Sequence, residues 1–489
     1  MEHIISFQNL EVSPYVVEQL LDVRVDHQIN EHSTFYFKAL LPEEKKDSYV
    51  KNSSQGCNVS LLIKSADGER DILFQGMVQD IKVEAIQGSY YIEVYAVSYS
   101  YLLDVEKKSR SFQNKKMSYS ELAQQVVADY ADAKVKDVVT HGADIGQLIV
   151  QYKETDWEFL KRLASHFHTG LVNDVHFDCP RCYFGIPQKE KHTLEISQYD
   201  VTKDLGKYLK LSKSGISGLR EQDFIYYQVE TYLPVNIGDK VQFQGQTLYV
   251  YQIRGRMEKG IFVHYLTLTT KKGMCQLYQW NDRIVGGSLN AKVVDVHNDQ
   301  VKVSLEVDEV SGHTPGKRCS FPYSTIYSSQ DGSGWYCMPE IGDQVRIYFP
   351  DGIEEHSYAI SSVHQEMDTS TQQSDDIESS DGSGGDYSGQ RDNPNIKSIR
   401  NKDGKEIRLA PDGIYIIAEG TTITLTDDGG ISILSDQNIE FKSDHSIIFC
   451  AEEDVNIIGQ TGIDLKCNET ASIKLQENIE VIGQEVKSN

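Results

Sequence analysis

The pattern that decides the fold lies in residues 430–449, which read GISILSDQNIEFKSDHSIIF. Apolar residues occur there in pairs spaced i, i+2, and the pairs recur every eight residues. Alternation with a period of two places both members of a pair on one face of a short strand. Turn formers such as Ser435-Asp436 and Ser443-Asp444 close the repeats. A short, fixed period predicts units that bury their apolar faces only by stacking.

The same octad extends in both directions along the C-terminal part of the chain. Its ten apolar pairs are Ile407/Leu409, Tyr415/Ile417, Ile423/Leu425, Ile431/Ile433, Ile439/Phe441, Ile447/Phe449, Val455/Ile457, Ile463/Leu465, Ala471/Ile473 and Ile479/Val481. The residue between the members of a pair is usually polar, as in Ser432, Glu440 and Asp464. One chain with so short a repeat would enclose only a thin core.

Three chains wound about one axis would bury all the inward pairs, and we therefore predict an intertwined triple-stranded β-helix. Its trimer core would be formed by Ile431, Ile433, Ile439, Phe441, Ile447, Phe449, Val455, Ile457, Ile463, Leu465, Ile473, Ile479 and Val481. At the ~4.8 Å spacing of stacked strands, ten octads give a needle roughly 50 Å long. An ordinary antiparallel sheet with regular hairpins is the alternative, but unbroken register over ten repeats argues against it.

Composition excludes several classes of protein. The 489 residues carry a formal net charge of −25, which argues against a nucleic-acid-binding surface. No run approaches the ~18 apolar residues of a transmembrane helix. The start, Met1 to Ile5, shows no basic region followed by a long apolar segment, so we expect synthesis in the cytoplasm without a signal peptide. The eight scattered cysteines are typical of reduced thiols rather than of a disulfide scaffold.

Upstream of the repeat, strand signals and helix signals alternate in blocks. Asp67-Gly68 and Gln87-Gly88 each separate two strand-like runs, which predicts hairpins in a first β-barrel. Ser118 with Glu121, and Thr155 with Glu158, form possible capping boxes that begin two helices. The phrase Ile-Gly-Asp-x-Val occurs at residues 237–241 and again at 341–345, which suggests two small barrels with one kind of strand entry.

The resulting prediction is a mainly β, multidomain chain with a few helices. Strands are expected to return after about residue 205, and five short strands at 291–296, 301–307, 334–338, 345–349 and 358–363 fit an OB-fold barrel. The predicted segments are 1–105, a β-barrel; 106–204, a helix-containing insert; 205–283, a second β-barrel; 284–367, the OB-fold barrel; 368–395, a flexible acidic Ser/Gly linker; and 396–489, the β-helix.

Candidate chemical sites are few. Cys179-Pro-Arg-Cys182 is a lone CxxC without a second pair at zinc-site spacing, and redox chemistry would need a βαβ context. His166 and His168, spaced i, i+2 on a helix, face different directions and are interpreted as structural. Acid pairs such as Glu354-Glu355 and Glu452-Glu453 are interpreted as solvated surface. Without a nucleophile motif, paired carboxylates or a metal cluster, we predict no enzymatic activity, no metal and no cofactor.

Three stretches resemble one family, the VgrG spikes of type VI secretion systems and the hub–spike proteins of contractile phage tails. Residues 110–116 (RSFQNKK) are similar to its R-x-F-Q-(N/D)-K passage. Residues 151–163 (QYKETDWEFLKRL) resemble its Q-Y-x-E-(S/T)-D-x-x-F-(L/I)-x-R-L helix. Residues 334–345 (GWYCMPEIGDQV) are similar to its G-W-G-x-x-x-x-P-x-x-G-x-(E/D)-V run. With the octads, the resemblance covers nearly the whole chain.

The resemblance implies a homotrimer in a tail-like injection particle exposed or delivered outside the cell. The barrels would form a hub between a Hcp-like inner tube and the baseplate, the OB-fold would be a collar, and the β-helix would puncture the target membrane. It also implies a PAAR-like tip protein, docking at Ile479, Val481 and Ile482, and possible effector cargo. The alternative is a β-solenoid adhesin that binds glycans, although the outward positions of the repeat are mostly polar rather than aromatic.

Overall fold

The computed structural model describes residues 4–45, 48–52, 57–64, 69–188, 190–194, 196, 198–311, 317–327, 329, 337–361, 395–401, 403–467 and 471–475. The chain forms two units, one up to residue 367 and the other from residue 368. The predicted linker at 368–395 lies, except for its last residue, outside the described residues. Within the described part, no helix is both long and apolar enough to cross a membrane.

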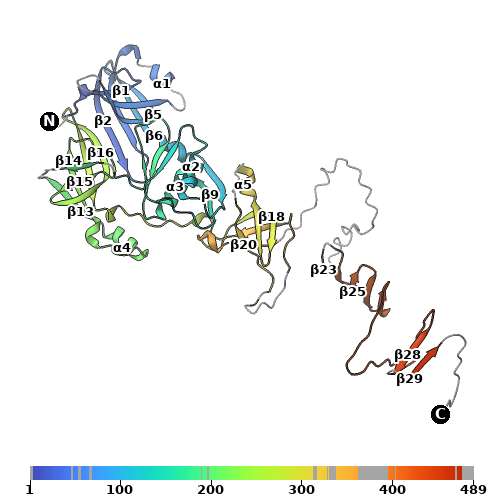
Figure 1. The fold of residues 1–489 in the computed structure, drawn as a ribbon. Coiled ribbons are helices and arrows are strands. Elements are labelled where there is room, and N and C mark those ends of the chain that lie inside the picture. Colours follow the sequence, from blue (N-terminus) through green and yellow to red (C-terminus); the bar gives the residue numbers. More distant parts are fainter. Residues whose placement is uncertain are drawn as a thin grey trace. The chain divides into compact units, whose positions relative to one another are not determined.

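A twelve-stranded sheet dominates the first unit (Figure 1). Its first half consists of β1 (Leu10–Ser13), β2 (Gln19–Gln28), β3 (Thr34–Leu41), β4 (Asn58–Lys64), β5 (Arg70–Ile86) and β6 (Ser89–Ser98). Its second half consists of β12 (Lys191–Thr193), β13 (Tyr199–Lys203), β14 (Ile225–Thr231), β15 (Lys240–Phe243), β16 (Gln246–Glu258) and β17 (Ile261–Thr269). The pairs along the main path, β1-β4-β5-β6-β3-β2-β16-β17-β14-β13, are antiparallel.

Of the two hairpin turns predicted in the first half, the one at Gln87-Gly88 is confirmed. Asp67 and Gly68 lie outside the described residues, and β4 and β5 on either side of them pair antiparallel. Alternate residues of β3 are buried, and Phe35 packs in the core against both Phe37 and Phe74 of β5. Strands β5 and β6 pair directly across Gln87 and Gly88. Both turn residues have positive φ, 52° and 83°, as a two-residue type I′ hairpin requires.

The two halves are not the separate barrels that the sequence predicts. Residues Arg24 to Gln28 of β2 pair antiparallel with Gln252 to Arg256 of β16, so one sheet runs through both. Each half still packs its own apolar core. The hydrophobic pattern along the chain predicts the two cores. It does not predict the long-range pairing between β2 and β16.

The insert between the halves carries two capped helices. Its elements are β7 (Lys107–Phe112), α2 (Tyr119–Val127), β8 (Lys134–Asp137), β9 (Ile149–Thr155), α3 (Asp156–Ser165), β10 (Leu171–Asn173) and β11 (Arg181–Phe184). Both predicted capping boxes are present: Glu121 N donates to Ser118 Oγ at 3.1 Å, and Glu158 N donates to Thr155 Oγ1 at 3.1 Å. The reciprocal bonds tie each acidic side chain back to the first turn.

The prediction that strands return at residue 205 is wrong for α4 (Leu205–Lys213). Asp204 Oδ1 accepts from Lys207 N at 2.8 Å and caps this helix. Leu211 is buried against Phe224 and Tyr226. The shorter helices are α1 (Ser48–Asn52), α5 (Glu306–Ser311) and 3-10 turns at Phe7–Asn9, Glu43–Lys45, Tyr99–Asp104, Glu221–Phe224, Lys272–Met274, Asp282–Ile284 and Glu354–His356.

The collar barrel (residues 284–361) has five strands in the order β20-β19-β18-β21-β22. They are β18 (Ser288–His297), β19 (Gln300–Leu305), β20 (Ser320–Pro322), β21 (Gln344–Tyr348) and β22 (Tyr358–Ile360). A parallel bridge between Tyr323 and Ala359 joins the two edges and closes the barrel. The predicted strand at 334–338 is wrong where described, since Cys337 and Met338 are in no strand, and residues 334–336 lie outside the described residues.

The repeated Ile-Gly-Asp phrase forms the same turn twice. Asp239 Oδ2 accepts from Asn236 N, and Asp343 Oδ2 accepts from Glu340 N, both at 2.8 Å. The glycine before each aspartate has a positive φ, 85° at Gly238 and 102° at Gly342. A residue with a Cβ would be strained there, which explains the recurring Gly-Asp pair.

The described residues of the second unit form strands and no helix, with a long segment outside any strand. Its strands β23 (Lys397–Arg400), β24 (Glu406–Ala410), β25 (Gly413–Ala418), β26 (Thr421–Thr426) and β27 (Gly430–Ser435) pair antiparallel in chain order. Residues 436–462, all described, form no strand, and β28 (Ile463–Cys467) pairs with β29 (Ala471–Leu475). Within one chain the first repeats thus pair as the antiparallel sheet that the sequence analysis disfavours. Winding of three chains into a β-helix stays a prediction.

Candidate functional site

The stretch around β9 and α3 builds a network of ion pairs, here called the ion-pair joint, inside the first unit. Arg110 Nη2 donates to Asp156 Oδ1 at 2.6 Å, and Arg110 Nε donates to Gln151 Oε1 at 2.8 Å. Lys108 Nζ lies 2.9 Å from Asp156 Oδ2, and the Tyr130 hydroxyl donates to the same oxygen at 2.8 Å. Asp156 is fully buried, so its charge is stable only because these donors surround it.

The joint continues from α3 to the collar barrel through Arg162. This guanidinium pairs with both oxygens of Glu154 at 2.9 Å, and its Nη1 donates to Glu354 Oε1 at 3.1 Å. Asn281 Nδ2 donates to the same Glu354 oxygen at 3.0 Å. Glu354 is only 4% exposed, so its interpretation as a solvated acid is wrong. Its partner lies 192 residues away in the chain, which sequence spacing could not reveal.

Three further contacts hold the insert, one to Arg283 just before the collar barrel and two to the collar barrel itself. Arg283 Nη1 and Nη2 donate to the two carboxylate oxygens of Glu158 at 2.7 Å each, and this bond lowers the pKa of Glu158 to about 2. Ser111 N and Oγ donate to the carboxylate of Asp308 at 2.6 and 2.7 Å. Cys319 N donates to Gln113 Oε1 at 3.1 Å. Two of the three stretches that carry the family resemblance therefore form this connection, most of which is buried.

The thiols and histidines singled out in the sequence are buried or half-buried and occupy structural positions. Burial raises the pKa of the Cys182 thiol to about 12, and Cys179 Sγ donates to Asp132 O at 3.4 Å. His166 stacks on Tyr278 at 4.6 Å between ring centroids, and burial lowers its pKa to about 3. Among the described residues, no group of three or more His, Cys, Asp or Glu is placed to hold a metal ion.

The octad residues of the second unit form an exposed apolar sheet face. Ile423 lies directly opposite Ile433, and Leu425 opposite Ile431, across β26 and β27. The register carries this face back through β25, β24 and β23. Its members are Ile399, Ile407, Leu409, Ile414, Ile416, Ile423, Leu425, Ile431 and Ile433.

One predicted pair lies on the other face of the sheet. Ile414 and Ile416 are opposite Leu425 and Ile423, whereas Tyr415 is opposite Thr424. The pair that belongs to the apolar sheet face is thus Ile414/Ile416, and the assignment to Tyr415/Ile417 is wrong by one residue. Because side chains alternate along a strand, a shift of one residue moves a pair to the opposite face.

Most of the predicted trimer-core residues are described, and they are exposed in the single chain. Exposure is 72% for Ile431 and 42% for Ile433. Ile463 is half-buried, and the other large apolar positions are exposed, namely Ile439, Phe441, Ile447, Phe449, Val455, Ile457 and Leu465. Ile473 lies in β29, and the predicted tip residues Ile479, Val481 and Ile482 lie outside the described residues.

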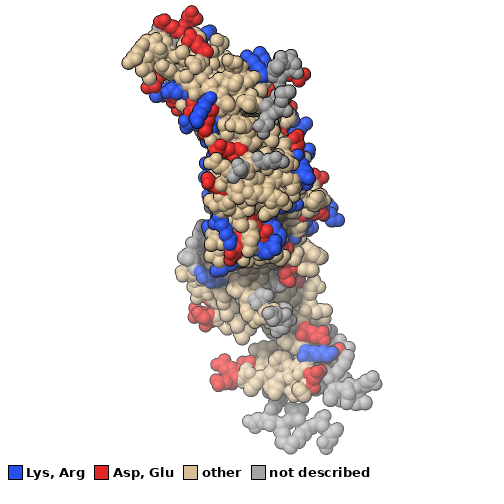
Figure 2. Space-filling model, turned by 90° about the vertical axis from the view of Figure 1, so that its left-hand side faces the viewer, with Lys and Arg blue, Asp and Glu red and all other residues tan. Residues whose placement is uncertain are grey.

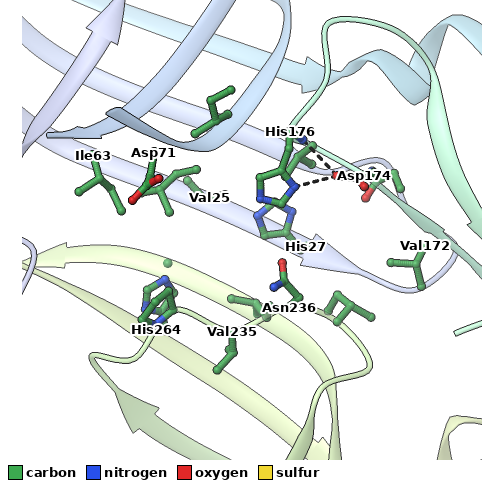
Figure 3. A pocket seen from close by; sticks show the side chains of 18 of the residues that line it. Val25, His27, Ile63, Asp71, Val172, Asp174, His176, Val235, Asn236 and His264 are labelled. Atoms are coloured by element: carbon green, nitrogen blue, oxygen red, sulfur yellow. Dashed lines mark hydrogen bonds and ion pairs between the residues drawn. The ribbon is translucent and has the colours of Figure 1, made fainter. Parts of the chain in front are cut away.

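A cavity of about 680 Å³ lies between the two halves of the large sheet (Figure 3). Its walls include His27 of β2, His264 of β17 and His176 from the segment after β10. His27 Nδ1 is 2.6 Å from Ser33 Oγ, and His176 Nδ1 is 2.7 Å from Asp174 Oδ1. Burial lowers the pKa of His27 to about 3 and that of His264 to about 4. The sequence analysis missed this group because its members come from three distant segments.

The buried histidines predict a loss of stability in mild acid. The unfolded chain returns His264 to a pKa of 6.5. Below pH 6.5 the unfolded chain therefore binds more protons than the folded chain. The free energy of unfolding decreases as the pH is lowered. At pH 5 the buried His264 lowers the free energy of unfolding by on the order of 2 kcal/mol relative to neutral pH. Replacing His264 by Phe should flatten this dependence in urea unfolding at pH 5 and 7. The exposed His297, replaced by Phe, is the control, and equal pH dependence in the two variants would contradict the prediction.

The chain thus combines a large, mostly antiparallel sheet with a helical insert, a closed five-stranded barrel and a repetitive β segment. In a comparison with protein families, residues 28–167 match the phage tail baseplate hub family. No curated protein matched the sequence.

Three solved structures of tail-like machines are similar to this chain. One is an E. coli component of the type VI secretion system, described as structurally similar to the bacteriophage T4 tail proteins gp27 and gp5. It is 12% identical, with a TM-score of 0.51, and the match covers 73% of this chain and 99% of that chain. A Francisella PdpA-VgrG complex (half-lidded) gives 8% identity, a TM-score of 0.49 and coverage of 88% and 87%. The 43 kDa tail protein of prophage MuSo2 from Shewanella oneidensis gives 13%, 0.42, and 55% and 99%.

The family resemblance and the mainly β, multi-sheet fold expected from the sequence are thus confirmed. At these identities the structural likeness establishes the fold alone.

On the face drawn in Figure 2, Lys, Arg, Asp and Glu of the described residues are interspersed rather than separated by sign.

Proposed function

We propose that this protein is the trimeric hub–spike of a contractile injection machine. The observation that carries the proposal is the apolar sheet face, which one chain leaves exposed. Large exposed apolar patches on a soluble protein mark interaction surfaces. Three copies packed about a common axis would cover this face on each of them, which fits the octad pattern. The match of residues 28–167 to the baseplate hub family supports the hub part of the proposal.

The proposed mechanism is mechanical. The large sheet joins the inner tube to the baseplate, and the second unit is driven through the target envelope when the sheath contracts. The ion-pair joint would transmit this force from the insert to the collar barrel. Pulling the two apart would leave buried charges unpaired, which is costly. We propose no catalytic role and no cofactor. The protein would be made in the cytoplasm and act outside it as part of the particle.

Two kinds of partner extend the proposal. A PAAR-like protein would dock at the end of the needle, at Ile479, Val481 and Ile482. Effector cargo is the second, and it is supported by analogy with the Francisella complex, in which VgrG is bound to PdpA. A β-solenoid adhesin remains the competing function, since a repetitive β segment alone serves both.

Deleting the gene in the bacterium that encodes it tests the proposal directly. We expect electron microscopy of lysates to show no complete sheathed particles, and target cells to survive. Re-expression of the full chain should restore both, whereas a chain lacking residues 462–489 should restore particles without their tip protein. Normal particle assembly in the deletion strain would contradict the hub–spike function. Loss of attachment to glycan-coated surfaces with intact particles would favour the adhesin.

A further inference from the structure

The cavity between the sheet halves has an apolar floor and an acidic rim. The floor is formed by Val25, Val172, Val235, Ile253 and Phe262. Among the charged lining residues, Asp71, Asp174 and Glu190 are acidic and only Arg70 is basic. With neutral histidines the lining therefore carries a net charge of −2. Arg70 Nη2 lies 3.3 Å from Glu11 Oε2, an oxygen that Lys64 Nζ also approaches at 3.0 Å, so part of the Arg70 charge is compensated outside the cavity.

One buried nitrogen of a residue that lines this cavity lacks a partner. His264 is 5% exposed, and its Nδ1 has no hydrogen-bond partner in the described part of the chain. Figure 3 shows His264 on the β17 side, with Asp71 and His27 on the opposite wall. A buried imidazole nitrogen without a partner is unfavourable, because its hydrogen bond to water is lost on folding. A ligand group that donates a hydrogen bond there would restore it.

We propose that this cavity binds an arginine or lysine side chain presented by a peptide segment of a partner protein. The cationic head would meet the acidic rim and donate to the neutral imidazole of His264. The aliphatic stem would lie on the apolar floor, as such stems do when their charge remains near polar groups. The cavity volume, about 680 Å³, is within the usual range of ligand sites and exceeds one side chain, so neighbouring peptide atoms fit as well.

Other ligand classes fit these walls less well. An anion would meet a net negative lining. A metal ion would need three or more ligand groups placed together, and the described residues provide no such group. A purely apolar ligand would leave His264 Nδ1 without a partner. A cationic group on an apolar stem matches the acidic rim, the apolar floor and the His264 nitrogen that lacks a partner.

Binding of two matched peptides to the full-length protein tests the proposal. The probe is a fluorescein-labelled pentapeptide with a central arginine, and the control carries citrulline, which has nearly the same shape without the charge. Fluorescence anisotropy should show saturable binding of the arginine peptide and at least about tenfold weaker binding of the citrulline peptide. No binding up to about 1 mM, or equal binding of both peptides, overturns the proposal.

Variants then locate the site. His264→Phe keeps a ring of similar size beside Phe262 but removes the nitrogen, and should weaken the arginine peptide about tenfold. Asp71→Asn removes one exposed rim charge without changing the core, and should weaken it several-fold. Asp299→Asn, an exposed acid in the β18–β19 turn, removes the same charge elsewhere and should have no effect. Equal affinities for wild type, His264→Phe and Asp71→Asn would show that the peptide binds elsewhere. If the wild-type protein binds zinc but not the arginine peptide, and His264→Phe loses zinc binding, the proposed ligand class is wrong and a metal ion takes its place.

Discussion

Replacing Ile423 and Ile433 by Asp is expected to reduce the assembled protein to single chains of 55.3 kDa. The two residues lie directly opposite each other on β26 and β27, within the apolar sheet face. Three copies would bring six carboxylates into one apolar core. Each buried, unpaired carboxylate costs several kcal/mol, which exceeds the margin of most assemblies. Light scattering and native mass spectrometry of the full chain measure the result.

Thr424 and Ser432 provide the matched control. They are also directly opposite each other on β26 and β27, but on the other face of the sheet. Replacing both by Asp adds the same charge to the same strands and should leave the trimer intact. A wild-type protein that is already a single chain would refute the assembly. Equal disruption by both double variants would show that the apolar sheet face is not the contact surface.

Replacing Arg162 by Met should lower the free energy of unfolding of the first unit by about 3–5 kcal/mol. The methionine is similar in length, but Glu154 and Glu354 would then remain buried without the guanidinium that pairs with both. Breaking a buried ion pair by removing one partner is costly for this reason. Denaturant unfolding followed by tryptophan fluorescence reports it directly, because Trp157 lies on the same helix.

Lys161→Met is the control for this change. Lys161 precedes Arg162 on α3 and is half-buried rather than enclosed, so its loss should cost less than about 1 kcal/mol. A double variant that also changes Glu354 to Gln should recover part of the stability lost in Arg162→Met, since it removes one unpaired charge. Similar stabilities of Arg162→Met and Lys161→Met would mean that the ion-pair joint does not hold the insert to the collar barrel.

Features encoded within a few residues were predictable from the sequence. Both capping boxes, the hairpin at Gln87-Gly88 and the turns at Asp239 and Asp343 are formed by side chains and backbone three residues apart or less. Local backbone preferences and short hydrogen bonds decide such structures, whatever the rest of the chain does. The same applies to the strands that the repeat forms at residues 406–435, which rest on alternation along single strands.

Contacts between distant segments were decided only by the tertiary structure. Glu354 has the sequence surroundings of a surface acid, yet Arg162 and Asn281 enclose it. The pairing of β2 with β16, and the gathering of His27, His176 and His264 around one cavity, likewise have no local signal. Even the apolar sheet face depends on register, which placed Ile414/Ile416 rather than Tyr415/Ile417 on it. A pattern along one strand gives two possible faces, and only the neighbouring strands select between them.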